Sequence, residues 1–110
     1  MAWENLTEID KAWIAGIFEG EGTAGIFNRY KDKKYPRVLI YNNDLSMLTE
    51  ILRLIGSGVI FERKKYIKNP NWKTSFTFTL NKKKDIDSFI KYIVPFIRSD
   101  YKKKQVARIL

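Results

Sequence analysis

Hydrophobic and polar residues recur along this 110-residue chain with two different periods, and each period predicts a kind of element. Apolar residues spaced three or four apart predict helices over residues 8–20, 45–55, 83–93 and 101–110. Alternation of apolar and polar residues predicts strands over residues 23–31, 35–41, 59–67 and 72–80. The order helix, strand, strand, helix, strand, strand, helix, helix predicts a single α+β domain over residues 1–110. In such a domain a four-stranded antiparallel sheet carries helices on one face.

Local signals mark the ends of the first two helices. Thr7 and Asp10 form a variant of the capping box before the first helix, and Asp44 is a favourable N-cap for the second. Gly56 and Gly58 end the second helix. The run from Ala12 to Phe18 contains no polar side chain, so we expect the first helix to be buried nearly all round.

The alternation also predicts that the sheet face away from the helices is polar and basic. Its members can donate hydrogen bonds, and they are Arg29, Lys31, Arg37, Tyr41, Arg63, Lys65, Lys73, Ser75, Thr77 and Thr79. A face of this composition can follow phosphates and reach base edges in a nucleic acid. An ordinary solvated surface is the alternative interpretation.

Charge is distributed unevenly along the chain. Twenty-one Lys and Arg against twelve Asp and Glu give a formal net charge of +9. Residues 1–28 hold one basic and five acidic residues, a net charge of −4. Residues 29–110 hold twenty basic and seven acidic residues, a net charge of +13. This balance favours a polyanion as partner, bound near a cation-dependent site. Membrane surfaces and acidic proteins are competing partners, but no basic amphipathic helix favours a membrane.

The chain has no cysteine and no histidine. Disulfides, thiolate zinc sites and imidazole catalysis are therefore excluded, so that carboxylates and lysines would have to perform any acid, base or metal chemistry. No apolar run approaches the roughly 20 residues of a membrane span. The expected setting is soluble and intracellular, without a small-molecule cofactor.

The end of the first helix departs from the usual preferences. Glu19 and Glu21 stand at a helix C-terminus, where the partial negative charge disfavours each carboxylate by roughly 0.3–1 kcal/mol. Gly16 and Gly20 each cost about 1 kcal/mol relative to alanine. Unfavourable choices of this kind gather at functional sites. A divalent cation would neutralise the carboxylates, whereas a plain C-cap with surface charges is the alternative.

The same helix carries small residues on one side. A second helix backbone could approach closely along a nearly flat surface made by Ala12, Ala15, Gly16 and Gly20.

The segment Ile14-Ala15-Gly16-Ile17-Phe18-Glu19-Gly20-Glu21-Gly22 resembles the motif that names the LAGLIDADG homing endonucleases. The whole chain resembles the αββαββα repeat of that family, in the segments Asn42-Asn43-Asp44, Ile55-Gly56-x-Gly58, Pro95-Phe96-Ile97 and Lys102-x-Lys104-Gln105. The resemblance implies the family's fold, with a saddle-shaped sheet. It also implies a site-specific endonuclease that hydrolyses both strands of DNA at a long, nearly palindromic site and leaves a staggered break. Because one motif is present, it implies a homodimer, encoded by an intron or another mobile element.

The resemblance implies roles for individual residues. Glu21 would bind the metal together with the Gly20 carbonyl, the metal being Mg²⁺ or Mn²⁺, with Ca²⁺ as a non-cleaving substitute. Lys102 and Asn42 would order the nucleophilic water, although Lys103, Lys104 and Asn43 leave the register open. The contact between the two motif helices would be formed by Ala12, Ala15, Gly16, Glu19 and Gly20. The family's further basic residue near the start of the second helix has no counterpart here, because Met47 lies in that region.

Two other functions stay open. The first is a DNA- or RNA-binding relative of the same fold that does not cleave, such as an intron maturase or a regulator. The second is a metal-free structural or RNA-binding α+β domain whose motif match is accidental. Heavy use of Lys, Ile, Asn, Tyr and Phe suggests an A·T-rich genome. The phage or bacterial cytoplasm, the mitochondrion and the chloroplast are all compatible with that composition.

Overall fold

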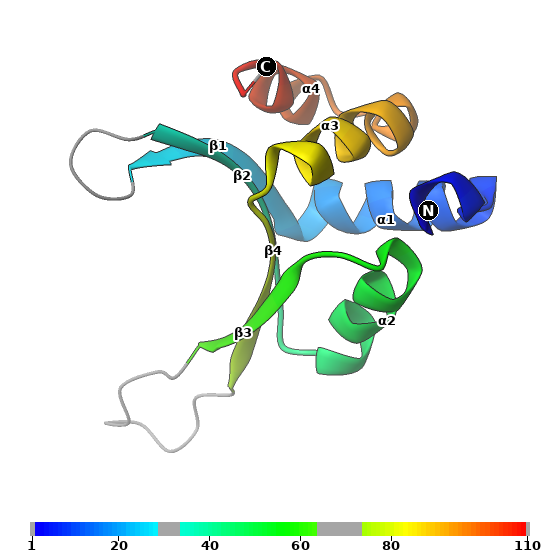
Figure 1. Ribbon diagram of the computed structural model, residues 1–110, viewed down its shortest axis with the longest axis vertical. Helices are drawn as coiled ribbons and strands as arrows, with labels where there is room; N and C mark the ends of the chain where they lie inside the picture. The colour runs from blue at the N-terminus through cyan, green and yellow to red at the C-terminus, as the bar shows by residue number, and fades with distance from the viewer. Residues whose placement is uncertain (1, 29–33, 64–73, 110) are drawn as a thin grey trace.

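A computed structural model describes residues 2–28, 34–63 and 74–109 of the chain (Figure 1). Within these ranges, two short 3₁₀ helices, η1 (Ala2–Asn5) and η2 (Val94–Phe96), accompany four α-helices and four strands. The helices are α1 (Glu8–Glu21), α2 (Leu45–Ile55), α3 (Lys83–Tyr92) and α4 (Asp100–Ala107). The strands are β1 (Gly22–Asn28), β2 (Lys34–Asn42), β3 (Val59–Arg63) and β4 (Ser75–Leu80). The predicted order of helices and strands is confirmed.

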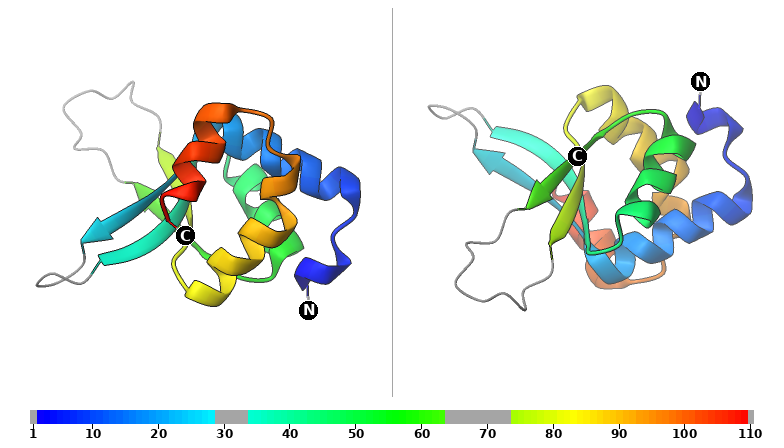
Figure 2. Two further views of the ribbon diagram at one scale, coloured as in Figure 1. Left: turned by 90° about the horizontal axis from the view of Figure 1, so that it is seen from above. Right: turned by 90° about the horizontal axis from the view of Figure 1, so that it is seen from below.

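The strands form one antiparallel sheet in the order β1-β2-β4-β3, so that β1 and β3 are its edges. Val38 in β2 pairs with Ala24 on one side and with Leu80 on the other, and all three side chains are buried. Cross-strand partners share a face, so this row defines the core face of the sheet. The helices gather on that face, as the two views of Figure 2 show, and the predicted α+β architecture is confirmed.

Aromatic residues join the helices across the core. The ring of Phe18 in α1 meets the ring of Phe89 in α3 edge to face, with 5.1 Å between their centroids. Trp3 in η1 is buried and stacks on Tyr92 at 6.3 Å. The element η1 was not predicted from the sequence.

Helix α1 is buried on one side only, so the prediction that it is buried nearly all round is wrong. Ile14, Ala15 and Phe18 are fully buried against the sheet and helices. The opposite side is open to solvent, with Ile9 80% exposed and Trp13 38% exposed. We call this side the open face of α1; its members are Ile9, Ala12, Trp13, Gly16 and Gly20.

The predicted helix starts are confirmed by their hydrogen bonds. The N–H of Asp10 donates to Thr7 Oγ1 at 3.0 Å, and the N–H of Thr7 donates back to Asp10 Oδ2 at 3.3 Å. Asp44 accepts from the N–H groups of Ser46 and Met47 at 3.0 and 3.3 Å. These local bonds begin α1 and α2 where the sequence predicts.

Parts of three predicted strands, residues 29–31, 64–67 and 72–73, lie outside the described residues. Within the described ranges, no helix combines the length and the hydropathy that crossing a membrane requires.

Candidate active site and nucleic-acid interface

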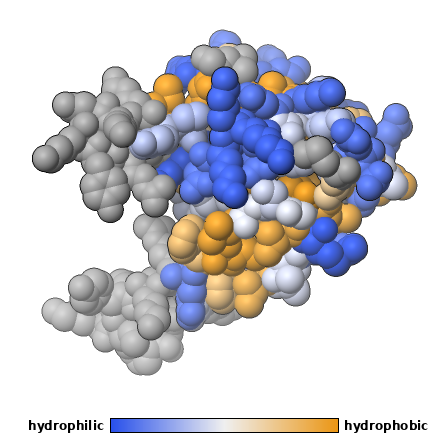
Figure 3. Space-filling model, in the orientation of Figure 1, coloured by the Kyte–Doolittle hydropathy of each residue, from blue (hydrophilic) through white to orange (hydrophobic). Residues whose placement is uncertain are grey.

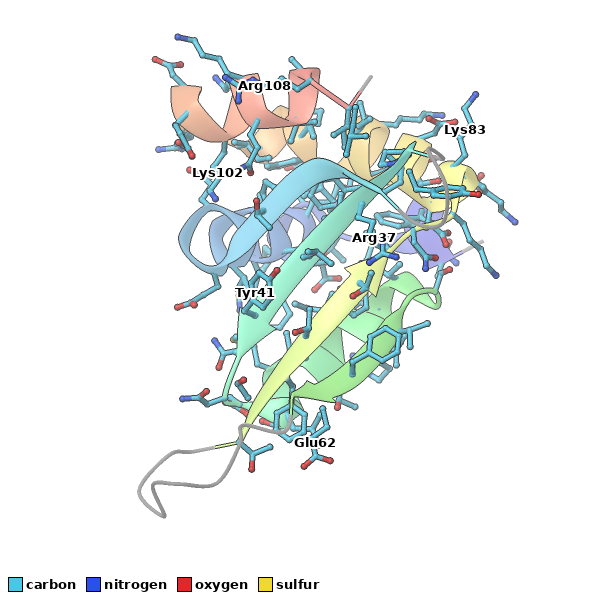
Figure 4. The ribbon with its side chains drawn as sticks, turned by 90° about the vertical axis from the view of Figure 1, so that its left-hand side faces the viewer. Arg37, Tyr41, Glu62, Lys83, Lys102 and Arg108 are labelled. Atoms are coloured by element: carbon cyan, nitrogen blue, oxygen red, sulfur yellow. The ribbon has the colours of Figure 1, made fainter. Side chains whose placement is uncertain are left out.

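The end of α1 and the first turn of α4 meet at the start of β1. Glu21 is exposed as the last residue of α1, and Gly22 opens β1. The ammonium of Lys102, a half-buried residue of α4, donates a hydrogen bond to the carbonyl of Gly22. Figure 4 shows Lys102 extending from α4 towards this junction. The structure therefore brings Lys102 to the residue that follows Glu21 in the chain.

Lys102 is the lysine of its run that makes this contact. Lys103 and Lys104 are exposed on α4. The sequence left the choice among the three lysines open, because it does not give the rotation of α4 against β1.

A second side chain of α4 also bonds to β1. Gln105 Oε1 accepts from the N–H of Ala24 at 2.9 Å. Gly22 and Ala24 are two residues apart, so their outward backbone groups lie along the same edge of the strand. Lys102 and Gln105 therefore form hydrogen bonds to the edge of β1 that has no neighbouring strand, and these bonds fix the position of α4 against β1.

Glu19 has a different environment from Glu21. Its two carboxylate oxygens accept from the N–H groups of Arg98 and Ser99, at 3.2 and 3.1 Å. Ser99 is the N-cap of α4, so Glu19 joins the end of α1 to the beginning of α4 within one protomer. Of the two motif carboxylates, Glu21 is the one that is exposed.

Asn42 is the last residue of β2, two positions beyond Ile40, which pairs with Gly22. This register places Asn42 at the end of the sheet where α1 finishes. Its side-chain oxygen accepts from the N–H of Asp44 at 2.8 Å. The adjacent Asp44 accepts from the Ser46 hydroxyl and nearby N–H groups, and these hydrogen bonds lower the pKa of its carboxyl.

The open face of α1 has room for another backbone. A Cβ added at Gly16 or at Gly20 would meet no atom within 4 Å in the protomer. Ala12 lies on this face, but Ala15 is fully buried in the core. The predicted contribution of Ala15 to a helix–helix contact is therefore wrong, because its side chain points into its own protomer.

The sheet face away from the helices, which we call the outer face, is defined by its register. Thr77 lies between Tyr41 and Phe61, and Thr79 lies between Leu39 and Val59. Both threonines alternate with core residues of β4, so these two rows point away from the helices. In Figure 1 the ends of the β1–β2 and β3–β4 pairs curve away from the helices, which makes the outer face concave.

Several predicted nucleic-acid contacts lie on this face. Figure 4 looks onto it and labels Arg37 and Tyr41. Arg37 and Thr77 are partly exposed, as is Ser75, and Tyr41 is 36% exposed. Arg63 pairs with Ser75 at the end of β3. The predicted residues Arg29, Lys31, Lys65 and Lys73 lie outside the described residues.

Thr79 does not fit the prediction. Its side chain is on the outer face but is only 4% exposed, between Leu39 at 7% and Val59. Thr79 is therefore not accessible for direct contact with a base edge.

The sequence analysis missed two residues of the outer face. Val59 and Phe61 are 46% and 56% exposed on β3. The prediction assigned Arg63 and Lys65 of this predicted strand to the polar face and did not include Val59 or Phe61. The signal was ambiguous because Val59, Ile60 and Phe61 form a continuous apolar run, and the pairing with β4 is needed to assign each residue to a side.

No protein-family model and no curated protein sequence matches the chain. Solved structures do match. The homing endonuclease I-CvuI, in complex with the I-CreI target, superposes with a TM-score of 0.67 and 17% identity over 91% of this chain. The LAGLIDADG meganuclease I-CpaMI, bound to uncleaved DNA, superposes with a TM-score of 0.68 and 16% identity over 84% of this chain. The group I intron-encoded homing endonuclease I-CeuI, complexed with DNA, superposes with a TM-score of 0.67 and 21% identity over 92% of this chain.

The chain has the LAGLIDADG homing-endonuclease fold. It spans 62% of the I-CvuI chain, 33% of the I-CpaMI chain and 52% of the I-CeuI chain. In this LAGLIDADG fold, the motif residues of the sequence form α1 and its junction with β1.

The oxygen donors at the end of the LAGLIDADG helix suit a hard cation. Mg²⁺ and Ca²⁺ prefer carboxylate and carbonyl oxygens, and Glu21 and Gly20 supply one of each. Across the described residues, one protomer holds no group of three or more Asp, Glu, His or Cys that could bind a metal.

Proposed function

We propose that this chain is one subunit of a homodimeric, site-specific DNA endonuclease that uses a divalent cation to hydrolyse phosphodiester bonds. The observation that carries the proposal is the junction of α1, β1 and α4. There the exposed carboxylate of Glu21 lies next in sequence to Gly22, whose carbonyl binds the Lys102 ammonium. The likeness to I-CvuI, I-CpaMI and I-CeuI, which were solved with DNA, supports duplex DNA as substrate.

The open face of α1 supports a dimer with a two-fold axis. Ile9 and Trp13 expose apolar surface that a second copy would remove from water. Gly16 and Gly20 leave space for the second backbone to come close. In an isologous contact the same face of each copy meets the other, which brings the two Glu21 residues to one region.

The dimer can be tested at Gly16. The substitution Gly16→Leu places a bulky side chain in open space of the protomer, and leucine also favours a helix more than glycine does. We expect a wild-type dimer and a folded Gly16→Leu monomer in sedimentation equilibrium. Ala107→Leu, at an exposed small residue of α4, is the matched control and should remain dimeric. A wild-type chain that stays monomeric with and without DNA contradicts the dimer.

Glu21 and the Gly20 carbonyl would hold the cation, with further oxygen atoms from the second subunit and from the DNA. When bound, Mg²⁺ would polarise the phosphate, activate water and stabilise the leaving oxygen. The two Glu21 carboxylates repel each other when brought together, so we expect cleavage to need Mg²⁺ or Mn²⁺. Ca²⁺ would support binding of DNA without cleavage.

Lys102 and Asn42 would order the attacking water. The Lys102 ammonium is fixed by the Gly22 carbonyl and keeps further N–H donors for water or phosphate. The oxygen of the Asn42 side chain is used by Asp44, which leaves its amide nitrogen as the donor. Since the chain has no histidine, the proton of the water passes to solvent.

The outer face would lie along the major groove of the DNA. The surplus of basic residues in 29–110 favours phosphate contacts, and Arg37, Ser75 and Thr77 offer donors for base edges. Two subunits related by a two-fold axis would require a long, nearly palindromic site. Each Glu21 would serve one strand, giving a staggered break.

The decisive experiment compares two carboxylates of α1. Duplexes bound by the wild-type chain are first selected from a randomised library, and cleavage and binding are then measured with Mg²⁺ and with Ca²⁺. Glu21→Gln should bind the selected duplex as the wild type does and should not cut it. Glu8→Gln, at an exposed acid of the first turn with the same change in charge, should bind and cut normally.

Cutting by Glu21→Gln at the wild-type rate would show that Glu21 is not the metal ligand. A wild-type chain that binds its duplex and never cuts it would instead be a DNA-binding relative of the fold, and the endonuclease proposal would fail.

A further inference from the structure

The outer face changes character from one side to the other. On β2 it presents Arg37 and the phenol of Tyr41, whereas on β3 it presents Val59 and Phe61 with no polar group at their tips. Figure 3, which views the molecule from the side of the sheet, shows an apolar area over β3 and towards α2, with polar side chains above it over α3. We call Val59 and Phe61 the apolar strip of the outer face.

The apolar strip is not part of the protomer core. Phe61 is 56% exposed and Val59 is 46% exposed, although both side chains belong to types that are usually buried. Their strand neighbours Thr77 and Thr79 lie beside them on the same face, and Thr79 is buried. In the two cross-strand rows that contain Thr77 and Thr79, the accessible surface on the β3 side therefore belongs to Phe61 and Val59.

The open face of α1 is a separate surface from the strip. Helix α1 packs on the core face of the sheet, and the strip lies on the opposite face. A second copy seated on α1 would leave the strip uncovered. The chain carries a formal net charge of +9 and presents Arg37 on the outer face, which favours a polyanion as the partner of this face.

In the major groove of duplex DNA, thymine is the base whose edge presents an apolar group. Thymine carries a 5-methyl group there, and phenylalanine and other apolar side chains contact it. We propose that Phe61, with Val59 beside it, reads thymine 5-methyl groups, so that the sequence preference of the β3 side is for thymine. This inference rests on the proposed function, since it assumes that the outer face binds duplex DNA.

The test removes the methyl group from the DNA. In a duplex selected by the wild-type chain, each thymidine is replaced singly by deoxyuridine, which keeps the base pair and lacks only the 5-methyl. Burial of one methyl group corresponds to a change in affinity of about threefold to fourfold. We expect a loss of this size at one or two thymines in each half of the site, measured with Ca²⁺ present to prevent cutting.

Substitutions at residue 61 assign the effect to this side chain. Phe61→Ala should bind the thymidine and deoxyuridine duplexes equally, whereas Phe61→Leu keeps an apolar tip and should retain part of the difference. Leu45→Ala is the matched control, because Leu45 is 43% exposed on α2 and outside the sheet. It should show the wild-type difference in full.

The outcomes separate the inference from the function on which it rests. Equal affinity of the wild-type chain for thymidine and deoxyuridine at every position would overturn the inference and leave DNA binding intact. A deoxyuridine effect that Phe61→Ala retains would assign the reading of the methyl to another residue. Failure of the wild-type chain to bind any duplex would overturn the proposed function. A change in association state of Phe61→Ala without DNA would make the strip a protein contact and overturn the inference.

Discussion

The two edges of the sheet are built differently. At β1, α4 supplies Lys102 and Gln105 to the outward carbonyl of Gly22 and the outward N–H of Ala24. At β3, no helix side chain bonds to the backbone among the described residues, and Val59 and Phe61 stand exposed beside the edge. The molecule thus has one edge whose polar groups are fixed by a helix and one edge that is open.

This difference corresponds to two requirements of the proposed endonuclease function. A group that takes part in hydrolysis must be held in place, and the hydrogen bonds from α4 to β1 hold Lys102 at the carbonyl of Gly22, the residue after Glu21. A group that selects a DNA sequence must be accessible and able to vary without loss of the fold, and exposed residues on an edge strand satisfy this condition. Substitutions of the α4 residues that bond to β1 should therefore lower the cleavage rate or the stability, whereas substitutions on β3 should leave the stability almost unchanged.

The largest expected effect comes from the β1 edge. Lys102→Met removes the ammonium bound to the Gly22 carbonyl, and in the proposed mechanism a positioned donor of this kind contributes a factor of about 100 or more to the reaction rate. We expect the rate of DNA cleavage to fall by that factor. Lys103→Met is the control, because it removes the same single positive charge, and it should cut DNA as the wild type does. DNA affinity should be the same for both variants, and a cleavage rate that falls equally in both would contradict the assignment of Lys102.

A smaller effect is expected at Gln105. Gln105→Leu leaves the N–H of Ala24, a residue only 5% exposed, without its acceptor. An unsatisfied buried donor costs about 1–3 kcal/mol, so we expect the free energy of unfolding in urea to fall by that amount. Gln105→Glu keeps an acceptor and should lose less. If the two variants are equally destabilised, packing of the side chain rather than the bond to β1 is responsible.

The pH dependence at Asp44 is expected to be weaker. Hydrogen bonds from Ser46 and from the Met47 N–H lower the pKa of the Asp44 carboxyl below its ordinary value. The stabilisation is therefore complete above the unfolded-state pKa and is lost as the pH falls through the folded-state value. Asp44→Asn keeps an N-cap that does not titrate. We expect its free energy of unfolding to fall less steeply than the wild type's between about pH 5 and pH 3. Parallel curves would contradict the role of Asp44.

The smallest effect is expected at the open edge. Val59→Thr keeps the branched shape at a side chain that is 46% exposed. Surface substitutions of this kind change the free energy of unfolding by less than about 0.5 kcal/mol. Thermal unfolding of Val59→Thr should match that of the wild type, and a clear loss of stability would show that the β3 edge supports the fold as the β1 edge does.

Local hydrogen bonds explain what could be predicted from the sequence. The helix starts at Thr7 and Asp44 depend on groups within three residues, and the alternation along β4 depends only on period. Contacts between distant segments explain what could not. The two motif carboxylates are the same residue type two positions apart, and α4, nearly 80 residues later, distinguishes Glu19 from Glu21.

Two further misses have the same origin. Because Ala12 to Phe18 is apolar throughout, periodicity did not show which side of α1 faces the core, and Ala15 was assigned to the wrong side. The apolar run of β3 likewise needed its partner strand before Phe61 could be assigned to the outer face. In both cases the missing information was the position of a neighbouring element.

The covering of β1 by α4 also has a consequence for biosynthesis. Helix α4 follows every other described element in the chain, so it leaves the ribosome after β1 and the rest of the sheet. Until then the nascent polypeptide presents unpaired backbone groups on β1, a template for association with another chain. Slow translation or premature termination before residue 100 should therefore favour aggregates over folded protein.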